Sequence, residues 1–447
     1  MDNHQSNQYL NAKAAWTTVV ILSLTYMFSM MDRQILVLLI EPIKTDLQIS
    51  DTEVSLLTGF AFAIVYTFMG IPMGRAADLW IRKYVIIIGV TIWSVLTMLS
   101  GFTKTFGQLF AARMGVGFGE AALTPTAYAL IPDLFPPNKL ARAMSVFVLG
   151  GTAIGGGMSL LLGGVVIGQV EGLGSITLPI IGEFKPWQLV LVVVGFLSLL
   201  MVIPLGLMKE PARHTSAVQT DTQVNLPFKQ VLQYLWDHKA FYGYFIIGAT
   251  LANLFGYGSA AWIPSYFIRL HEWDASSTGM TLGMLYIVPA LIGGLSGGWL
   301  SDYFYNKGYA GAPLYLMLGV MLLSIPCMVL FVYLPSLTLN LIFLFLLYLL
   351  ISFFFVLYPT VIQMATPNRM RAQISAIHLL VGNLAGIGFG PTVIALVTDY
   401  GFQDEMAVGH SIVIVGVLAY GIGALALLKA LKPFTNEVVA LNSGVQQ

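Results

Sequence analysis

Two pairs of charged residues lie inside long apolar segments. Asp32 and Arg33 interrupt the first such segment, residues 14–40, and Arg113 and Glu120 lie in another. The spacing of Arg113 and Glu120 puts them on one face of a helix, about two turns apart. A charge in the hydrocarbon core costs about 2.5–3.5 kcal/mol on the most lenient scale, so such residues are usually functional. An acid whose arginine partner comes and goes can exchange a proton, so we predict proton coupling at Asp32 and Glu120.

Asp32 and Arg113 are expected at similar depths. At about 1.5 Å per residue, Asp32 lies roughly 25 Å into its helix, and Arg113 lies roughly 9 Å in from the opposite side of a core about 30 Å thick. We therefore predict that they pair in one conformation, with Arg113 near the substrate. Arg33, about 100° around the helix from Asp32, is expected to bind an anionic substrate or to reach Glu120. The alternative for each is a static salt bridge that fixes helix packing.

Glycines surround this helix face. Gly115, Gly117 and Gly119 leave the helix surface between and beside the two charges nearly bare. Another helix or a ligand could therefore approach the backbone closely.

The second half of the chain contains no comparable charges within its apolar segments. Its candidate substrate contacts are Asn253, Tyr257 and Tyr358, although most of them could simply form hydrogen bonds between helices. His378 is expected to have a gate or packing role. Charge in one half and apolar surface in the other would suit an amphipathic anion, with its head toward Arg33.

Composition places the chain in the membrane. It has 447 residues, of which 57% are hydrophobic and 9% charged, whereas soluble domains are about 25% charged. The single cysteine excludes a disulfide framework. Zero net charge without a basic tail argues against nucleic acid as a partner. The sequence has no hydrolase, kinase, phosphate-loop or metal motif, so we expect no enzyme activity, no cofactor and no metal.

Apolar runs predict an all-α polytopic protein with twelve transmembrane helices. They are expected at 15–39, 53–77, 84–102, 107–131, 142–168, 187–208, 241–268, 276–301, 312–333, 337–364, 372–398 and 408–430. This pattern predicts a six-helix bundle at 1–208, a polar linker at 209–240 with an interfacial helix near 228–238, and a second six-helix bundle at 241–447.

Basic residues set the expected orientation. Most loop Lys and Arg lie on the side shared by the termini and the linker, which predicts that both termini are cytoplasmic in a cell (inner) membrane. The halves also repeat, because Pro137–Ser145 returns as Pro367–Ser375 and Gly74–Asp78 as Gly298–Asp302. Parallel repeats favour two bundles with a site between them.

Gly74-Arg-Ala-Ala-Asp78, followed by Arg82-Lys83, resembles the loop signature of the major facilitator superfamily, with departures at Leu79 and Ile81. Within that superfamily, the Asp32-Arg33 pair and the stretch from Arg113 to Pro136 resemble the spinster family. That resemblance implies export of sphingolipids or lysophospholipids. The fifth apolar segment lacks the proline of the drug-antiporter signature, which argues against a multidrug pump.

The loop signature is expected to form a cytoplasmic gate. Asp78 could meet the positive end of a facing helix, and Arg82 could pair with an acid across the bundle interface. Membrane topology alone is the alternative explanation. The predicted gate residues are Gly74, Asp78, Arg82, Lys83, Arg142 and Asp302.

These observations predict a secondary transporter that works by alternating access. Its expected substrate is a lipid-like or amphipathic organic anion, coupled to protons, and its expected partners are that substrate, protons and membrane lipids, with the chain a monomer. The alternatives are a proton-coupled symporter of a small organic acid or sugar acid and a non-transporting membrane sensor or scaffold.

Overall fold

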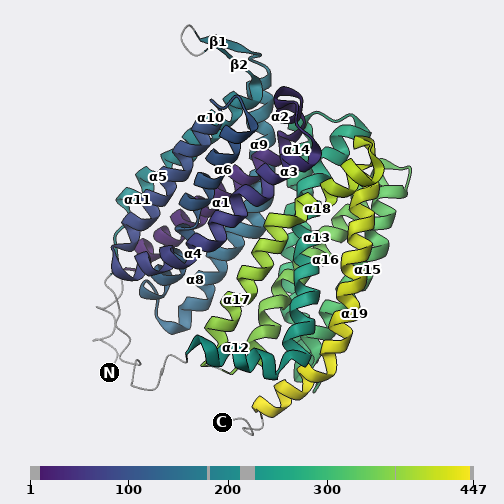
Figure 1. Ribbon diagram of the computed structural model, residues 1–447. Helices are drawn as coiled ribbons and strands as arrows, with labels where there is room; N and C mark the ends of the chain where they lie inside the picture. Colours follow the sequence, from purple (N-terminus) through teal and green to yellow (C-terminus); the bar gives the residue numbers. More distant parts are fainter. Residues whose placement is uncertain (1–10, 179–181, 212–226, 368, 443–447) are drawn as a thin grey trace. The chain divides into compact units, whose positions relative to one another are not determined.

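The computed structural model describes residues 11–178, 182–211, 227–367 and 369–442 (Figure 1). The chain forms two compact units. The first consists of Met1–Thr215 and Ala261–Ile287, and the second of Ser216–Ala260 and Val288–Gln447. The predicted division at 1–208, 209–240 and 241–447 stays a prediction, and most of the linker lies outside the described residues.

The first unit is built from helices joined by short turns and one hairpin. Its elements are α1 (Ala12–Leu38), α2 (Ile40–Leu47), α3 (Asp51–Ser55), α4 (Ala61–Leu79), α5 (Arg82–Ser100), α6 (Phe106–Glu120), α7 (Leu123–Leu130), α8 (Pro137–Leu149), α9 (Gly155–Glu171), β1 (Ile176–Leu178), β2 (Gly182–Phe184), α10 (Pro186–Leu200) and α11 (Val202–Leu207). β1 pairs with β2 antiparallel, with Ile176 opposite Phe184. Side-chain caps start several helices, such as Asn11 at α1 and Thr105 at α6.

Among the described residues, six α-helices lie wholly in the second unit. They are α12 (Phe228–Asp237), α15 (Ala312–Tyr333), α16 (Leu337–Ala365), α17 (Arg371–Asn383), α18 (Gly390–Leu396) and α19 (Val408–Asn442).

Two long helices, α13 (Lys239–His271) and α14 (Ala275–Asn306), belong to both units. The segment Ala261–Ile287, which joins their facing ends, packs with the first unit. Pro264 in α13 and Pro289 in α14 lie close to the points where each helix passes from one unit to the other. A proline inside a helix removes one backbone hydrogen bond, yet the structure continues both helices through these positions.

Eleven helices in the described residues are long and apolar enough to cross a membrane. The remaining predicted span, 107–131, is present as α6 and α7, which are separated by a turn at Ala121 and Ala122. Each of these two helices is too short to span alone, so this predicted span is helical but is divided by the turn.

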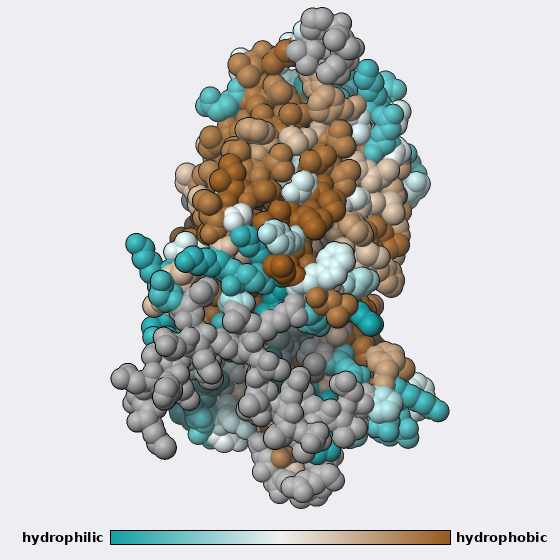
Figure 2. All heavy atoms as spheres, turned by 90° about the vertical axis from the view of Figure 1, so that its left-hand side faces the viewer, coloured by the Kyte–Doolittle hydropathy of each residue, from teal (hydrophilic) through white to brown (hydrophobic). Residues whose placement is uncertain are grey.

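The surface of the first unit carries a broad hydrophobic band, which Figure 2 shows from the side of α5, α10 and α11. Exposed residues on these helices include Ile88, Leu99, Phe196 and Ile203. A soluble monomer rarely exposes such a large contiguous apolar surface, whereas a membrane protein presents it to lipid.

Candidate functional site

The four charged residues singled out from the sequence come together between α1 and α6. Asp32 and Arg33 lie near the end of α1, and Arg113 and Glu120 lie on α6. All four belong to the first unit. Asp32, Arg113 and Glu120 are buried, and the Arg33 side chain keeps 19% of its surface exposed.

Glu120 forms a close ion pair with Arg33. Its Oε2 accepts hydrogen bonds from Arg33 Nε at 2.9 Å, from Arg33 Nη2 at 2.7 Å and from the Ser29 hydroxyl at 2.6 Å. The guanidinium also covers two rings of α4, at 4.3 Å from the centroid of Phe62 and 4.7 Å from that of Tyr66. Rings in this position attract a cation, so Arg33 has a second set of contacts that does not depend on Glu120.

Asp32 forms a looser pair with Arg113. Arg113 Nη1 lies 3.6 Å from Asp32 Oδ2, beyond ordinary hydrogen-bond distance. The Thr97 hydroxyl of α5 lies 2.8 Å from each carboxylate oxygen of Asp32. The predicted pair is therefore present, with a hydroxyl from a third helix beside the acid.

Several polar atoms of this cluster have no hydrogen-bond partner among the described residues. They are Arg113 Nε, Arg113 Nη2 and Glu120 Oε1, all buried. Buried polar atoms are nearly always paired, so each unpaired one calls for an explanation. The cluster therefore contains more buried hydrogen-bonding atoms than its own contacts satisfy.

The bare face of α6 is occupied by neighbouring helices and not by open space for a ligand. A Cβ at Gly117 would lie 2.6 Å from the backbone oxygen of Phe62 on α4, and one at Gly119 would lie 2.7 Å from the backbone nitrogen of Trp93 on α5. Of the two possibilities left by the sequence, the structure therefore shows the close approach of helices. Because these glycines lack a side chain, the backbones of α4 and α5 can lie close to α6.

The predicted contacts of the second unit are mainly aromatic. Asn253 donates to the carbonyl of Ala249 in its own helix at 2.9 Å. Tyr358 stacks on Phe245 with 5.8 Å between centroids and meets the His378 ring edge-on. Tyr257 packs edge-on against a neighbouring phenylalanine of α16. Tyr257 and Tyr358 therefore lie among aromatic rings, and their role as substrate contacts, like that of Asn253, stays a prediction.

The loop signature forms contacts within the first unit. Arg82 pairs with Asp133, which follows α7 in the same unit, and the expected pairing across the bundle interface stays a prediction. Lys83 Nζ donates to the carbonyls of residues 206 and 208 at 2.6 and 2.8 Å. Glu210 accepts from the backbone N–H groups of Arg82 and Lys83, which caps α5. This set of contacts joins α5 to the end of α11.

The other predicted gate residues lie on α4, α8 and α14. Gly74 lies on α4, where a Cβ would be 3.8 Å from that of Pro125. Asp78 lies near the end of α4, and Arg142 and Asp302 are exposed on α8 and α14.

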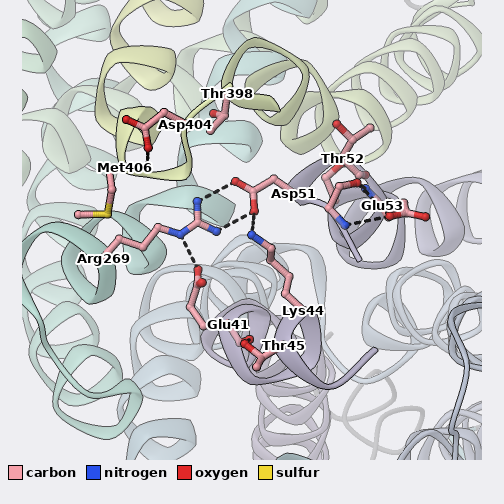
Figure 3. A network of polar contacts seen from close by, with 12 residues as sticks. Glu41, Lys44, Thr45, Asp51, Thr52, Glu53, Arg269, Thr398, Asp404 and Met406 are labelled. Carbon is pink, nitrogen blue, oxygen red and sulfur yellow. Dashed lines mark hydrogen bonds and ion pairs between the residues drawn. The ribbon is translucent and has the colours of Figure 1, made fainter. Parts of the chain in front are cut away.

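A second charged cluster was not expected from the sequence. Arg269, near the end of α13, donates to Glu41 at 2.8 Å and makes two hydrogen bonds of 2.7 Å to Asp51, which also pairs with Lys44 (Figure 3). These four residues all belong to the first unit. The sequence showed only scattered loop charges, because Arg269 lies 218 positions from Asp51.

Comparison with known proteins assigns the family. Residues 22–391 match the family model described as Major Facilitator Superfamily. The chain belongs to the Major Facilitator Superfamily. It is a transporter of this superfamily and not an enzyme, and the superfamily fold predicted from its loop signature is confirmed.

Relatives in this superfamily also support the predicted resemblance to spinster proteins. Protein spinster homolog 1 of Xenopus tropicalis is 26% identical over 86% of this chain and 73% of its own length. An MFS-type efflux pump of Mycolicibacterium smegmatis is 25% identical over 96% of this chain and 95% of its own. A solved bacterial homologue of the human lysosomal transporter Spinster superposes with a TM-score of 0.75 at 22% identity, over 97% of this chain and 98% of that one.

Proposed function

We propose that the protein is a proton-coupled secondary transporter of an amphipathic or lipid-like organic anion and that it works by alternating access. The observation that carries this proposal is the pair of acid–arginine contacts between α1 and α6, one close and one loose, inside a membrane-spanning unit. Charged residues at such depth are costly and are usually retained for transport or proton transfer.

Glu120 and Asp32 are the proposed proton sites. The Glu120 carboxylate accepts hydrogen bonds from Arg33 and Ser29, and the Asp32 carboxylate faces Arg113 and the Thr97 hydroxyl. A conformational change that moves the arginine away would favour the protonated acid, because burial disfavours an unpaired charge. The proton and the conformation are then coupled, since each protonation state favours a different arrangement of the helices.

Arg33 is the proposed anion-binding residue, with Arg113 in support. Nη1 of Arg33 makes no hydrogen bond to the described residues, and the guanidinium is the partly exposed member of the cluster. Aromatic contacts keep it in place when Glu120 is protonated. The aromatic surroundings of Asn253, Tyr257 and Tyr358 suit an apolar chain, and the resemblance to spinster proteins implies a lysophospholipid-like or sphingolipid-like substrate.

The remaining parts of the proposal concern placement and gating. We infer a cell (inner) membrane with both termini cytoplasmic, because basic residues gather on the side of the helices that the termini share. A monomer stays the expected state of the chain. The proposed cytoplasmic gate comprises Gly74, Asp78, Arg82, Lys83, Arg142 and Asp302. The Arg82 and Lys83 contacts support a role in holding α5 in place while the gate moves.

Flux into proteoliposomes tests this proposal. An imposed pH gradient should drive uptake or release of a lysophospholipid, and Asp32→Asn should abolish this flux while thermal stabilisation by the substrate persists. If short organic acids stabilise the protein and are transported, and neither effect depends on the length of their carbon chain, a small-acid symporter would be supported instead. Absence of flux and counterflow with every anion tested would support a sensor or scaffold.

A further inference from the structure

Helix α12 has three distinct faces. At about 100° per residue, Phe228, Leu232 and Trp236 form one apolar stripe, and their side chains are 58%, 47% and 68% exposed. A polar stripe of Lys229, Gln233 and Asp237, also exposed, lies next to it.

The third face of α12 packs against other helices of the second unit, to which α12 itself belongs. Val231 is fully buried, and the ring of Tyr234 meets that of Tyr242 in α13 at 5.9 Å. His238, just after the helix, approaches Glu437 of α19, with Nε2 3.6 Å from Oε1. Burial raises the pKa of Tyr234 to about 12, with a smaller contribution from the charge of Glu437. These contacts hold α12 against the ends of α13 and α19 (Figure 1).

A helix with one face on protein, one apolar and one polar fits the edge of a bilayer. In that position one face of α12 contacts the other helices of the second unit, the apolar stripe contacts lipid and the polar stripe contacts water. A helix surrounded by water would leave three large apolar side chains exposed in one row without a reason. Trp is also enriched at the membrane–water interface, where its ring lies at the level of the headgroups.

Lysines accompany aromatic rings at this end of the second unit. Lys239 Nζ lies 4.5 Å from the ring centroid of Trp236, Lys307 Nζ lies 4.4 Å from that of Tyr303, and Lys429 Nζ lies 5.5 Å from that of Tyr244. Chain topology puts these lysines at the same end, because α13 starts there and α14 ends there. An aromatic belt edged with lysines complements anionic headgroups.

We propose that α12 is an in-plane membrane anchor that binds anionic lipid through its Phe228–Leu232–Trp236 stripe and through Lys229 and Lys239. The apolar stripe enters the boundary between headgroups and acyl chains, while Lys229 on the polar stripe and Lys239 beside Trp236 contact lipid phosphates. Such helices bind by apolar burial together with electrostatic attraction. The inference does not depend on which substrate is transported.

The test uses a fluorophore at two neighbouring positions. The full chain with Cys327→Ala, which removes its one cysteine, is labelled with a nitrobenzoxadiazole group at Leu232→Cys or, as the matched control, at Gln233→Cys. The protein is reconstituted in vesicles of phosphatidylcholine and phosphatidylglycerol in which either lipid carries a nitroxide near the headgroup. Aqueous iodide is the second quencher. We expect nitroxide lipid to quench the label at 232 and iodide to quench the label at 233.

The lipid preference tests the two lysines. Nitroxide phosphatidylglycerol should quench the label at 232 more strongly than nitroxide phosphatidylcholine, and Lys229→Gln or Lys239→Gln should each lower that preference about fivefold, the equivalent of about 1 kcal/mol. Lys104→Gln, in the first unit, is the control and should not change it. The proposal is overturned if iodide quenches both labels equally, if the label at 232 is shielded from both quenchers by protein, or if both lipids quench it alike.

Discussion

Replacement of Glu120 by Gln should shift the transporter away from the conformation described above. Glu120 Oε2 accepts three hydrogen bonds, two of them from Arg33, and a hydrogen bond to a charged group contributes about 1.5–3 kcal/mol. Gln keeps an acceptor oxygen but loses the charge. Breaking a fully buried pair costs about 3–5 kcal/mol, and here the cost is smaller because Arg33 retains its two aromatic contacts.

A loss of about 2 kcal/mol is therefore expected, which is about 30-fold in the population of two states if the pair is absent from the second state. The direction follows from the charge. Charged Glu120 favours the paired state, so protonation at low pH, like Gln at any pH, should move the population away from it. Wild type should shift on acidification, and Glu120→Gln should be shifted already and respond less to pH, because Asp32 remains as the second proposed proton site.

Double electron–electron resonance can follow this change as the distance between spin labels at Tyr84 and Tyr309. The measurement uses reconstituted protein that lacks Cys327. Both tyrosines are exposed, so labels there should disturb few contacts. Glu120→Asp retains the charge and is the matched control. A distance distribution and pH response of Glu120→Gln that equal those of wild type would show that Glu120 is a packing residue, and the coupling argument would be wrong.

The remaining predictions concern the other charges. Asp32→Asn should abolish flux driven by a pH gradient while substrate binding persists, and unchanged flux in proteoliposomes would contradict the proton role. Arg33→Ala should weaken anion binding more than Arg33→Lys, because Lys keeps the charge but not the fork of donors; equal binding by wild type and the Ala variant, measured by thermal shift, would exclude Arg33 from the site. Asp51→Asn should lower the unfolding temperature in detergent more than Glu41→Gln does. Asp51 is the acid that pairs with both Arg269 and buried Lys44, whereas Glu41 pairs with Arg269 alone among the described residues; equal shifts by tryptophan fluorescence would refute this account of the network.

Helix periodicity and depth were enough to predict much of the site. The rise per residue put Asp32 and Arg113 at one depth, and the structure brings them together. The angle between Asp32 and Arg33 left Glu120 as one possible partner of Arg33, and that contact is present. These contacts were predictable because straight helices in a bilayer convert sequence position into height.

Other contacts could not be predicted because they depend on how helices meet. Ser29 and Thr97 resemble many other hydroxyl residues in apolar segments until packing places them beside the acids. Arg82 has several possible acids within reach of a loop, and only the path of the chain after α7 selects Asp133. Arg269 likewise finds Asp51 through tertiary contact, without any local spacing that would indicate it.

The assignment of Ala261–Ile287 to the first unit has a consequence for synthesis on the ribosome. Lys44 and Asp51 are close in sequence and can pair as soon as α2 and α3 have formed. Arg269 follows Asp51 by 218 residues, and at about 5–20 residues per second it emerges roughly 10–45 seconds later. Over that interval the first six apolar segments are in the membrane without the hairpin of α13 and α14 that completes their packing. Nascent chains arrested before residue 287 should therefore be more accessible to proteases at Asp51 than chains arrested after it.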